Sequence, residues 1–485
     1  MDLNYEDSME KYDFMNRLTK IKQNIVIAYS VYMLFFFVFF CGSSFFNIVY
    51  VKRAAYLIGT TFFILAEMIL FLISRFKGYR PKVYSTDLII VALFFSFIIS
   101  TSFSLNKDEA IWGYSAKGTG LLVYECGLVA MLFIRRYFVW SELLEKIVFA
   151  GMGIEFILQI LNRFNIDPLN MCSSLAESDK GIYLGTLGHI NYAASYDSLM
   201  LALLIIYFLS TNNKDSRIFC GMNIFLGFMA GICCCSDGFY LGVITSFVVA
   251  VGFCIHEIKA VKYLYIEFML FMIGCAILSC ACWLSGIEFW GISKKLIHIE
   301  GIITFIAMLP VVILIHFFRR AISLKSYISI LGTLIIVAII FLVIVNINPE
   351  LINENSFLSI LYFDQSWGNY RGGIYVNSIL LWIQSDFNHK LWGYGFNTVY
   401  DALQSRNLGI VNNQNICDAH NIILNSLITS GLVGTVLWGF LIRCGLRRLM
   451  GISFVLVFLA QGIVNGPQII TTPIVLFMFG VILAE

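Results

Sequence analysis

The sequence predicts an all-α polytopic membrane protein with about 12–14 transmembrane helices, and three observations support this fold class. Hydrophobic residues make up 59% of the 485 residues and charged residues only 13%, with a mean hydropathy of +0.83, whereas about a quarter of the residues of a soluble domain are charged. Apolar runs long enough to cross a bilayer recur along the chain. Lys and Arg residues concentrate in alternate loops between these runs, as the positive-inside rule describes.

The apolar runs divide the chain into four segments. Residues 1–23 form a charged amino-terminal segment, and residues 24–347 hold transmembrane helices 1–11 with short loops. Residues 348–419 form one long polar segment, and residues 420–485 hold the last transmembrane helices. The predicted spans are 24–42, 54–74, 87–103, 119–135, 144–162, 192–210, 218–235, 238–256, 264–284, 301–318, 327–347, 421–442, 449–464 and 468–484.

The loop charges predict the orientation of the chain. If the amino end is cytoplasmic, the loops on that side carry nearly twice as many Lys and Arg residues as the loops on the other side. We therefore expect both termini to be cytoplasmic and the segment 348–419 to face outward. The net charge of +2 does not indicate a nucleic-acid partner, so we expect a lipid bilayer and no nucleic acid around this chain.

The cysteines predict neither a metal site nor a redox motif. No Cys-x-x-Cys pair occurs, and the run Cys233-Cys234-Cys235 lies in an apolar stretch, where packing is the expected role. Cys172 and Cys417 fall in predicted outer loops, so a disulfide between them is an open alternative.

Three polar stretches share the predicted outer face: residues 102–120, residues 183–193 and the long segment 348–419. The second stretch contains Gly185, Gly188 and Asn191 just before a span. Glycine lets the backbone turn and approach a ligand closely, and irregular backbone at membrane depth is tolerated only against protein or a wet cavity. These residues are candidates for binding a substrate, although a plain turn explains each glycine taken singly.

The long polar segment contains an amphipathic helix. Its apolar stripe recurs at helical spacing and comprises Val376, Ile379, Leu380, Ile383 and Phe387. We expect this helix to lie on the outer membrane surface or to cap the bundle. Arg371, Tyr375, Ser378 and Trp382 fall on a different face, and Gly393 and Gly395 end the segment.

Arg371 would stand in the first turn of that helix, where the helix dipole disfavours a cation. This conflict predicts an anionic partner for the guanidinium. The alternative is an interfacial arginine that contacts lipid headgroups.

The order of the motifs resembles the bacterial O-antigen ligase and polymerase family, in the form seen in Gram-positive members. The resemblance runs from about residue 100 to the end of the chain. The residues that carry it are the loop Gly113–Gly120, Gly185-Thr186-Leu187-Gly188 with Asn191 and Ala194, Arg371 at the head of the amphipathic helix, Leu391-Trp392-Gly393-Tyr394-Gly395, His420-Asn421 and Gly431-Leu432-Val433-Gly434.

The resemblance implies a metal-independent integral-membrane glycosyltransferase of the GT-C type, without a cofactor. Such an enzyme takes a glycan from a polyprenyl diphosphate, such as undecaprenyl diphosphate, at the outer face of the cytoplasmic membrane and moves it to an acceptor hydroxyl. In a polysaccharide polymerase of capsule or cell-envelope biosynthesis, which is the expectation here, the acceptor is another lipid-linked repeat unit. In a ligase it is another glycolipid or a protein. The alternative from another class is a polysaccharide flippase or transporter, for which the sequence offers no convincing internal repeat.

The chemistry of this transfer assigns roles to two residues. Breaking the bond between sugar and diphosphate develops negative charge on the leaving group, which the Arg371 guanidinium can stabilise. The acceptor hydroxyl must lose a proton, and the His420 imidazole titrates in the right range to accept it. Asp418 could orient His420, although two residues that far apart on a helix point away from each other. Tyr375 and Asn421 are candidate substrate contacts, and the alternative for His420 is an interfacial histidine bonded to a neighbouring loop.

One position departs from the family pattern. A turn in which family members often carry a second arginine here contains Asp237, in Cys235-Ser236-Asp237-Gly238. Three alternatives follow. Another outer cation replaces the arginine, Asp237 acts on the acceptor, or the chain is inactive; the available cations are Lys117, Arg163, Lys180 and Arg406.

Carboxyl groups also occur within the predicted spans, where they are costly and often functional. They are Glu67, Glu125, Glu155, Asp197 and Glu267. Asp197 comes early in the span that follows Gly185 and could face the same cavity as the site.

Overall fold

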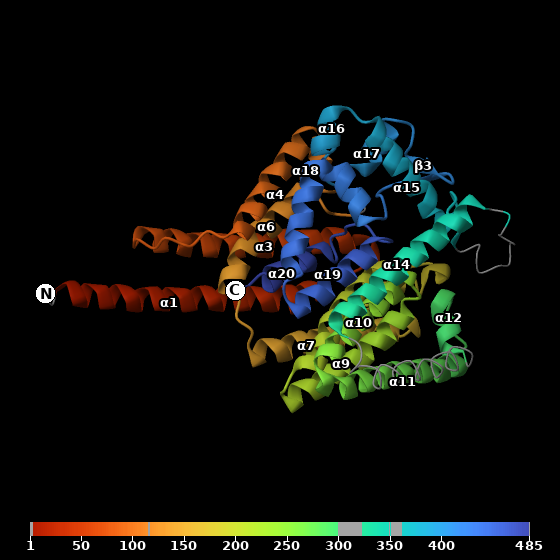
Figure 1. The fold of residues 1–485 in the computed structure, drawn as a ribbon, viewed down its shortest axis with the longest axis horizontal. Helices are drawn as coiled ribbons and strands as arrows, with labels where there is room; N and C mark the ends of the chain where they lie inside the picture. Colours follow the sequence, from red (N-terminus) through yellow and green to blue (C-terminus); the bar gives the residue numbers. More distant parts are fainter. Residues whose placement is uncertain (1–2, 115–116, 299–322, 349, 351–360, 485) are drawn as a thin grey trace.

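The computed structural model describes residues 3–114, 117–298, 323–348, 350 and 361–484. Over these residues the chain is mostly α-helical, with very little sheet (Figure 1). Its strands form two short antiparallel hairpins, β1 (Tyr183–Leu184) with β2 (Gly188–His189) and β3 (Ile410–Val411) with β4 (Gln414–Asn415). The predicted all-α class is therefore confirmed.

Helices occupy the predicted spans that fall within the described residues. The first part of the chain forms α1 (Leu3–Val31), a π-helical turn (Tyr32–Phe36), α2 (Phe37–Phe39), a short 3-10 turn (Phe45–Asn47), α3 (Ile48–Phe76), α4 (Ser85–Ser102), α5 (Lys107–Trp112), α6 (Leu121–Tyr137) and α7 (Glu142–Arg163). After two more 3-10 turns (Met171–Ser174 and Glu177–Asp179) and the first hairpin come α8 (Ile190–Ser210), α9 (Lys214–Cys233), α10 (Asp237–His256), another 3-10 turn (Ile258–Ala260), α11 (Val261–Ser285) and α12 (Gly291–Ile297). Outside the long polar segment, the remaining helices are α14 (Leu324–Ile347), α18 (Ile422–Gly445), α19 (Leu449–Gly462) and α20 (Thr472–Ile482). The predicted span 301–318 lies outside the described residues.

Within the described residues, nine helices are long and apolar enough to cross a membrane. They are Asp13–Phe39, Phe45–Phe76, Ser85–Ser102, Ile190–Ser210, Lys214–Cys233, Asp237–His256, Val261–Ser285, Leu324–Ile347 and Ile422–Gly445. The other predicted spans in this part are also helical. However, α6, α19 and α20 have only 17, 14 and 11 residues, and α7 carries several charged side chains. The chain is thus a multi-pass membrane protein by the length and composition of its helices.

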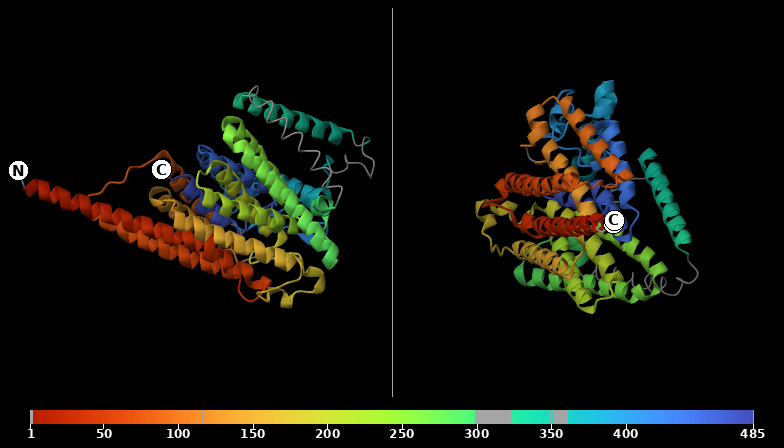
Figure 2. Two further views of the ribbon diagram at one scale, coloured as in Figure 1. Left: turned by 90° about the horizontal axis from the view of Figure 1, so that it is seen from below. Right: turned by 90° about the vertical axis from the view of Figure 1, so that its left-hand side faces the viewer.

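The centre of the bundle is α8. Buried residues occur all around this helix, from Ile190 to Leu209, and it packs against α9, α10 and α19. A helix that is apolar on every side requires neighbours or lipid on every side. In contrast, α14 exposes nearly its whole apolar surface and buries only Val345 among its residues. Figure 2 shows α14 along the outside of the bundle, as expected of a helix whose surface contacts lipid.

The long polar segment forms a cap at one end of α4 and α18 (Figure 1). It contains α15 (Trp367–Gln384), α16 (Phe387–Trp392), α17 (Val399–Gln404) and the β3–β4 hairpin. These elements share a small hydrophobic core of their own, separate from the main core of the bundle, which includes Tyr375, Leu381, Tyr394 and Ile428. We refer to residues 361–419 as the cap segment.

The amphipathic helix is present, and it begins where the sequence predicts. Three residues with left-handed backbone precede Arg371, so regular helix starts at this arginine. Tyr375, Ser378 and Leu381 are buried against the cap core. Four residues of the predicted apolar stripe, Val376, Ile379, Leu380 and Ile383, lie on the other side and are exposed. The helix ends at Gln384, so Phe387, the fifth residue of the predicted stripe, belongs to α16 instead. This arrangement suits a helix that rests on the membrane surface with its apolar stripe.

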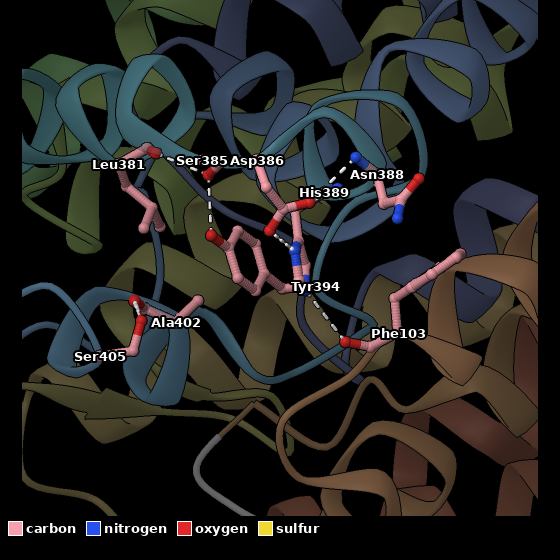
Figure 3. A network of polar contacts seen from close by, with 9 residues as sticks. All are labelled: Phe103, Leu381, Ser385, Asp386, Asn388, His389, Tyr394, Ala402 and Ser405. Carbon is pink, nitrogen blue, oxygen red and sulfur yellow. Dashed lines mark hydrogen bonds and ion pairs between the residues drawn. The ribbon is translucent and has the colours of Figure 1, made fainter.

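A polar network attaches the cap segment to the end of α4 (Figure 3). The His389 Nδ1 atom lies 2.5 Å from a carboxylate oxygen of Asp386, and its Nε2 atom lies 3.2 Å from the Phe103 carbonyl oxygen. The Tyr394 ring stacks on the imidazole with centroids 4.1 Å apart, and its hydroxyl bonds to that of Ser385 at 2.8 Å. One histidine therefore joins α16 to a helix nearly three hundred residues earlier in the chain.

Backbone contacts between α16 and α18 complete the attachment. The Tyr394 and Gly395 amides donate to the carbonyls of Ile428 and Thr429 at 2.8 and 3.0 Å. α18 is broken at Gly431, which has a left-handed φ of 65°, and Gly393, at the end of α16, has a φ of 85°. A Cβ atom on Gly393 would overlap backbone atoms of Thr429 in α18, and a Cβ atom on Gly431 would overlap backbone atoms of Leu391 in α16. The two glycines are thus required by close approach of the backbones.

Candidate functional site

A buried carboxylate joins two cationic or basic side chains at the base of the cap segment. Asp418 is only 3% exposed, and its Oδ2 atom lies 2.7 Å from the Lys117 Nζ atom. Its other oxygen, Oδ1, lies 3.3 Å from the His420 Nδ1 atom. Lys117 comes from the loop between α5 and α6, so the fold brings together two predicted outer stretches that are far apart in the sequence.

The backbone explains how Asp418 and His420 meet. Residues two apart on a helix would diverge, but this part of the chain is a turn, and α18 begins only at Ile422. The His420 amide donates to Asp418 Oδ1 at 2.7 Å, and His420 has a φ of 45°. Asp is suited to such local turns because its side chain can accept from a backbone amide two residues on. The prediction that the Asp418 and His420 side chains point away from each other is therefore wrong, because they do not lie on a helix.

Asn421 serves as the cap of α18. Its Oδ1 atom accepts from the amides of Ile423 and Leu424, and its Nδ2 atom donates to the Ile463 carbonyl at 3.3 Å. A side chain that caps a helix end stabilises orphan amides. Asn421 thus fixes the start of α18 next to His420. Its side-chain amide has a structural role in these contacts.

The charges around His420 shift the pKa values of the group. Burial raises the pKa of Asp418, but Lys117 and His420 outweigh it and bring the pKa to about 2. Burial lowers the pKa of Lys117, but Asp418 and Tyr192 raise it above its ordinary value. Burial, followed by Lys117 and Arg371, lowers the pKa of His420, against the opposing effect of Asp418. The arrangement therefore favours a neutral imidazole beside a paired Lys117 and Asp418.

Arg371 and Tyr375 reach the same region from α15. The Tyr375 hydroxyl donates to the His420 carbonyl at 3.3 Å and also to the Ile463 carbonyl. The Arg371 guanidinium contacts the Gly368 carbonyl at 3.4 Å and is close enough to lower the pKa of His420. Arg371 is half-exposed and forms no ion pair with any of the described residues. Its charge is therefore free to meet an anion.

His189, which sequence reasoning did not select, lies beside this group. Its Nδ1 atom accepts from the Asn191 amide at 3.2 Å, and its ring lies 5.6 Å from the Tyr192 ring. Burial, then Lys117 and His420, lowers the pKa of His189 to about 4. The same Tyr192 ring lies 5.5 Å from the Lys117 Nζ atom. The sequence offered one signal that could have identified His189, namely its position between Gly188 and Asn191 in the second polar stretch.

The structure places the predicted glycines of this stretch in a packed hairpin. Gly185 has a φ of 57°, and the Glu155 carboxylate occupies the position that a Cβ atom would need. Its amide donates to the Asn162 side chain at 2.7 Å. Gly188 has a φ of 86° and packs near Ile48. Both glycines thus position the backbone around protein groups, which matches the plain-turn alternative.

Asn191 and Asp237 lie near the start of α8 and α10. The Ser236 hydroxyl donates to the Asn191 Oδ1 atom at 2.8 Å, which ties the two helix starts together. Asp237 is the exposed first residue of α10. Its acidic side chain is favourable there because it faces the positive end of the helix dipole.

Of the four outer cations that could replace the expected arginine, Lys117 lies at the His420 group. Arg163 is buried and donates to the carbonyls of Gly181 and Glu288 at 3.1 and 2.9 Å. Lys180 pairs with Glu177 at 2.5 Å, and Arg406 is exposed in the loop after α17. The structure therefore singles out Lys117 by its contact with Asp418.

The structure bears on two possibilities that the sequence left open. Asp197 is fully buried between α7 and the end of α9, where it accepts from Gln159 at 3.0 Å and contacts the Cys234 thiol at 3.5 Å. Its partners thus belong to the bundle interior and not to the His420 group. Cys172 and Cys417 are both free thiols, so the disulfide alternative is not realised.

A comparison with known protein families and with curated proteins finds no match to this chain. Among the described residues, no group of three or more His, Cys, Asp or Glu side chains is arranged to hold a metal ion. What the site offers chemically is a half-exposed imidazole next to a buried carboxylate, with two cations, Lys117 and Arg371, close enough to lower the pKa of the imidazole. Such a group can accept a proton from a hydroxyl and bind a phosphate-bearing anion.

Proposed function

We propose that the protein is a membrane glycosyltransferase of the GT-C type that polymerises glycan repeat units carried on a polyprenyl diphosphate at the outer face of the cytoplasmic membrane. The observation that supports this proposal is the joining of Arg371, Lys117, Asp418 and His420 at the base of the cap segment. A base and two cations at one end of a membrane bundle match the needs of glycan transfer from a lipid diphosphate.

In the proposed reaction, an acceptor hydroxyl attacks the anomeric carbon of the donor sugar. Its oxygen forms the new glycosidic bond, and the hydroxyl proton moves to His420. The bond between the anomeric carbon and the diphosphate oxygen breaks, and the electron pair leaves with the diphosphate. Asp418 stabilises the imidazolium that forms, because it faces the ring at 3.3 Å.

The cations act on the leaving group in this proposal. Arg371 can approach the diphosphate without first breaking an ion pair with the described residues. Lys117 supplies the second positive charge that the family pattern places at position 237. Because Lys117 is already paired with Asp418, it stabilises the charge of the diphosphate at a distance as well as by direct contact. Asp237 itself would repel a diphosphate, so its proposed role is limited to the acceptor or to the cap of α10.

The test is reconstitution of the full-length protein in liposomes with a lipid-linked oligosaccharide. Growth of the glycan on the lipid carrier supports a polymerase, and transfer to an added glycolipid supports a ligase. The Arg371→Ala and His420→Ala variants should lose transfer by at least about a hundredfold while they insert and fold normally. Translocation of the glycan without growth, or full activity of His420→Ala, would contradict the proposal.

A further inference from the structure

A cavity lies within the bundle directly beneath the His420 group. It has a volume of about 60 Å³ and is enclosed by α4, α6, α8, α18, α19 and α20. Gly466 lines it, and a Cβ atom built on Gly466 would lie 3.0 Å from the Asp418 carboxyl carbon. Gly466 therefore lies both at the wall of the cavity and next to the carboxylate of the site.

One wall of the cavity carries polar side chains that lack partners. Asn425 and Ser195 are each 7% exposed, and their side chains form no hydrogen bond with any of the described residues. The neighbouring Gln461 is different, because its amide nitrogen donates to the carbonyls of Ala194 and Gly238 at 3.2 and 3.0 Å. Burying an amide without a partner is unfavourable. Asn425 and Ser195 instead line the cavity, so a water or a ligand hydroxyl there can supply the missing hydrogen bonds.

The facing wall is aromatic. The Phe396 ring lies 4.7 Å from Phe97 and 4.4 Å from Tyr124 between centroids, and all three residues line the cavity. The residues that line the cavity include amides, hydroxyls and aromatic rings, and none of them is Lys, Arg, Asp, Glu or His. Such a lining suits an uncharged ligand with hydroxyl groups on one side and an apolar face on the other.

The size of the cavity limits what can enter. About 60 Å³ holds roughly four water molecules at about 15 Å³ each. Sugar hydroxyls can replace such waters without loss because they make the same hydrogen bonds. The volume thus admits one edge of a sugar ring and not a whole oligosaccharide.

We propose that this cavity receives the hydroxyl-bearing edge of one uncharged sugar residue, held by Asn425 and Ser195, and that it selects neutral sugars over uronic acids at the reacting position. This inference rests on the proposed function. A carboxylate placed there would be buried without a cation, and this penalty excludes acidic sugars. The sugar could belong to the donor or to the acceptor, since both must approach His420.

The experiment uses the full-length protein in lipid nanodiscs and three probes: bare polyprenyl diphosphate, polyprenyl diphosphate bearing one glucose residue, and polyprenyl diphosphate bearing one glucuronic acid residue. If the cavity holds the donor sugar, glucose should increase the affinity over that of the bare lipid by at least tenfold, and glucuronic acid should not. Asn425→Leu and Ser195→Ala should reduce this gain, while the affinity for the bare lipid stays unchanged and reports intact folding.

A second arm addresses the acceptor. Methyl glucoside and methyl glucuronide are added to protein saturated with the bare lipid, and binding is followed by saturation-transfer NMR. If the cavity holds the acceptor sugar, only methyl glucoside should bind, and Asn425→Leu should abolish its signal. The inference is overturned if neither arm distinguishes neutral from acidic sugar, or if the distinction survives both substitutions. Failure of the bare lipid diphosphate to bind, or binding that Arg371→Ala does not weaken, would instead overturn the proposed function.

Discussion

The Lys117 Nζ atom lies 2.7 Å from the Asp418 Oδ2 atom, although the two residues belong to opposite halves of the sequence. The carboxylate is almost fully buried, whereas the lysine side chain is 16% exposed. A buried charge is tolerated when a partner of opposite sign remains with it. This pair therefore fixes the loop between α5 and α6 against the base of the cap segment, and its charges shift the pKa of the neighbouring His420.

We predict that Lys117→Met destabilises the protein by about 3–5 kcal/mol, because it leaves the Asp418 carboxylate buried without a partner. Thermal unfolding in detergent measures the effect. The Lys117→Met/Asp418→Asn double variant should recover much of the loss, because it removes both charges. Lys180→Met is the matched control, since the Lys180–Glu177 pair is exposed and should matter little. Equal destabilisation by both lysine substitutions would contradict the assignment.

The second prediction concerns the pH dependence of transfer. The pKa of His420 is lowered by burial, Lys117 and Arg371 and is raised by Asp418. A base must be neutral to accept a proton, so activity should fall only when the pH drops through this lowered pKa, below the ordinary value of about 6.5. The groups that face His420 are Lys117 and His189, from the α5–α6 loop and the start of α8, and Arg371 and Asp418, from the cap segment.

Substitutions of the two charged neighbours should move this acidic limb in opposite directions. Lys117→Met removes a cation, which raises the pKa of His420 and shifts the limb to higher pH. Asp418→Asn removes an anion, which lowers that pKa and shifts the limb to lower pH. Profiles of kcat/KM against pH for wild type and both variants provide the measurement. A limb that stays in place in both variants would show that His420 is not the titrating base.

Helices and their boundaries were largely predictable because composition and periodicity determine them locally. The start of regular helix at Arg371 follows from the sequence and appears in the structure. The predicted single helix, however, ends at Gln384, and a second helix, α16, ends just before Gly393. The face that α15 buries also follows from the separation of Tyr375 and Ser378 from the apolar stripe. The number of spans was less predictable, because α19 and α20 are short helices within apolar runs that suggested longer ones.

The site was predictable in part. Arg371, Tyr375, Asp418 and His420 were selected from the sequence, and the structure brings them together. The contribution of Lys117 depends on a contact between remote segments, which no local pattern encodes. The roles of Gly185 and Asp197 could not be decided from the sequence for a related reason. A glycine motif looks the same in sequence whether it faces a ligand or, as here, Glu155. A carboxyl within a span likewise looks the same whether its partner is a ligand or, as here, Gln159.

The third prediction concerns the attachment of the cap segment by His389. This side chain contacts Asp386, Tyr394 and the Phe103 carbonyl. Its replacement by Ala should weaken the docking of α16 on α4 by about 1–2 kcal/mol, in line with the loss of one or two partly buried hydrogen bonds. Hydrogen exchange should then become faster at the amides of α16. His256→Ala, at the exposed end of α10, should leave those amides unchanged, and unaltered exchange in the His389 variant would contradict the proposed attachment.

The fourth prediction compares two glycines on α18. Gly431 has a φ of 65° and meets the backbone of Leu391, whereas a Cβ atom on Gly439 would meet nothing within 4 Å. Gly431→Ala must therefore strain the backbone and push α16 away from α18, and we expect a loss of at least about 1–2 kcal/mol. Gly439→Ala should stabilise the same helix by up to about 1 kcal/mol, because alanine has the higher helix propensity. Both values come from thermal unfolding of the full-length protein in one detergent.

Because Gly431 also fixes the contact between α16 and α18, its variant should lose protection of the Tyr394 and Gly395 amides from hydrogen exchange, whereas Gly439→Ala should keep that protection. If Gly431→Ala were as stable as Gly439→Ala, the break in α18 would not be needed for the close approach of these two backbones.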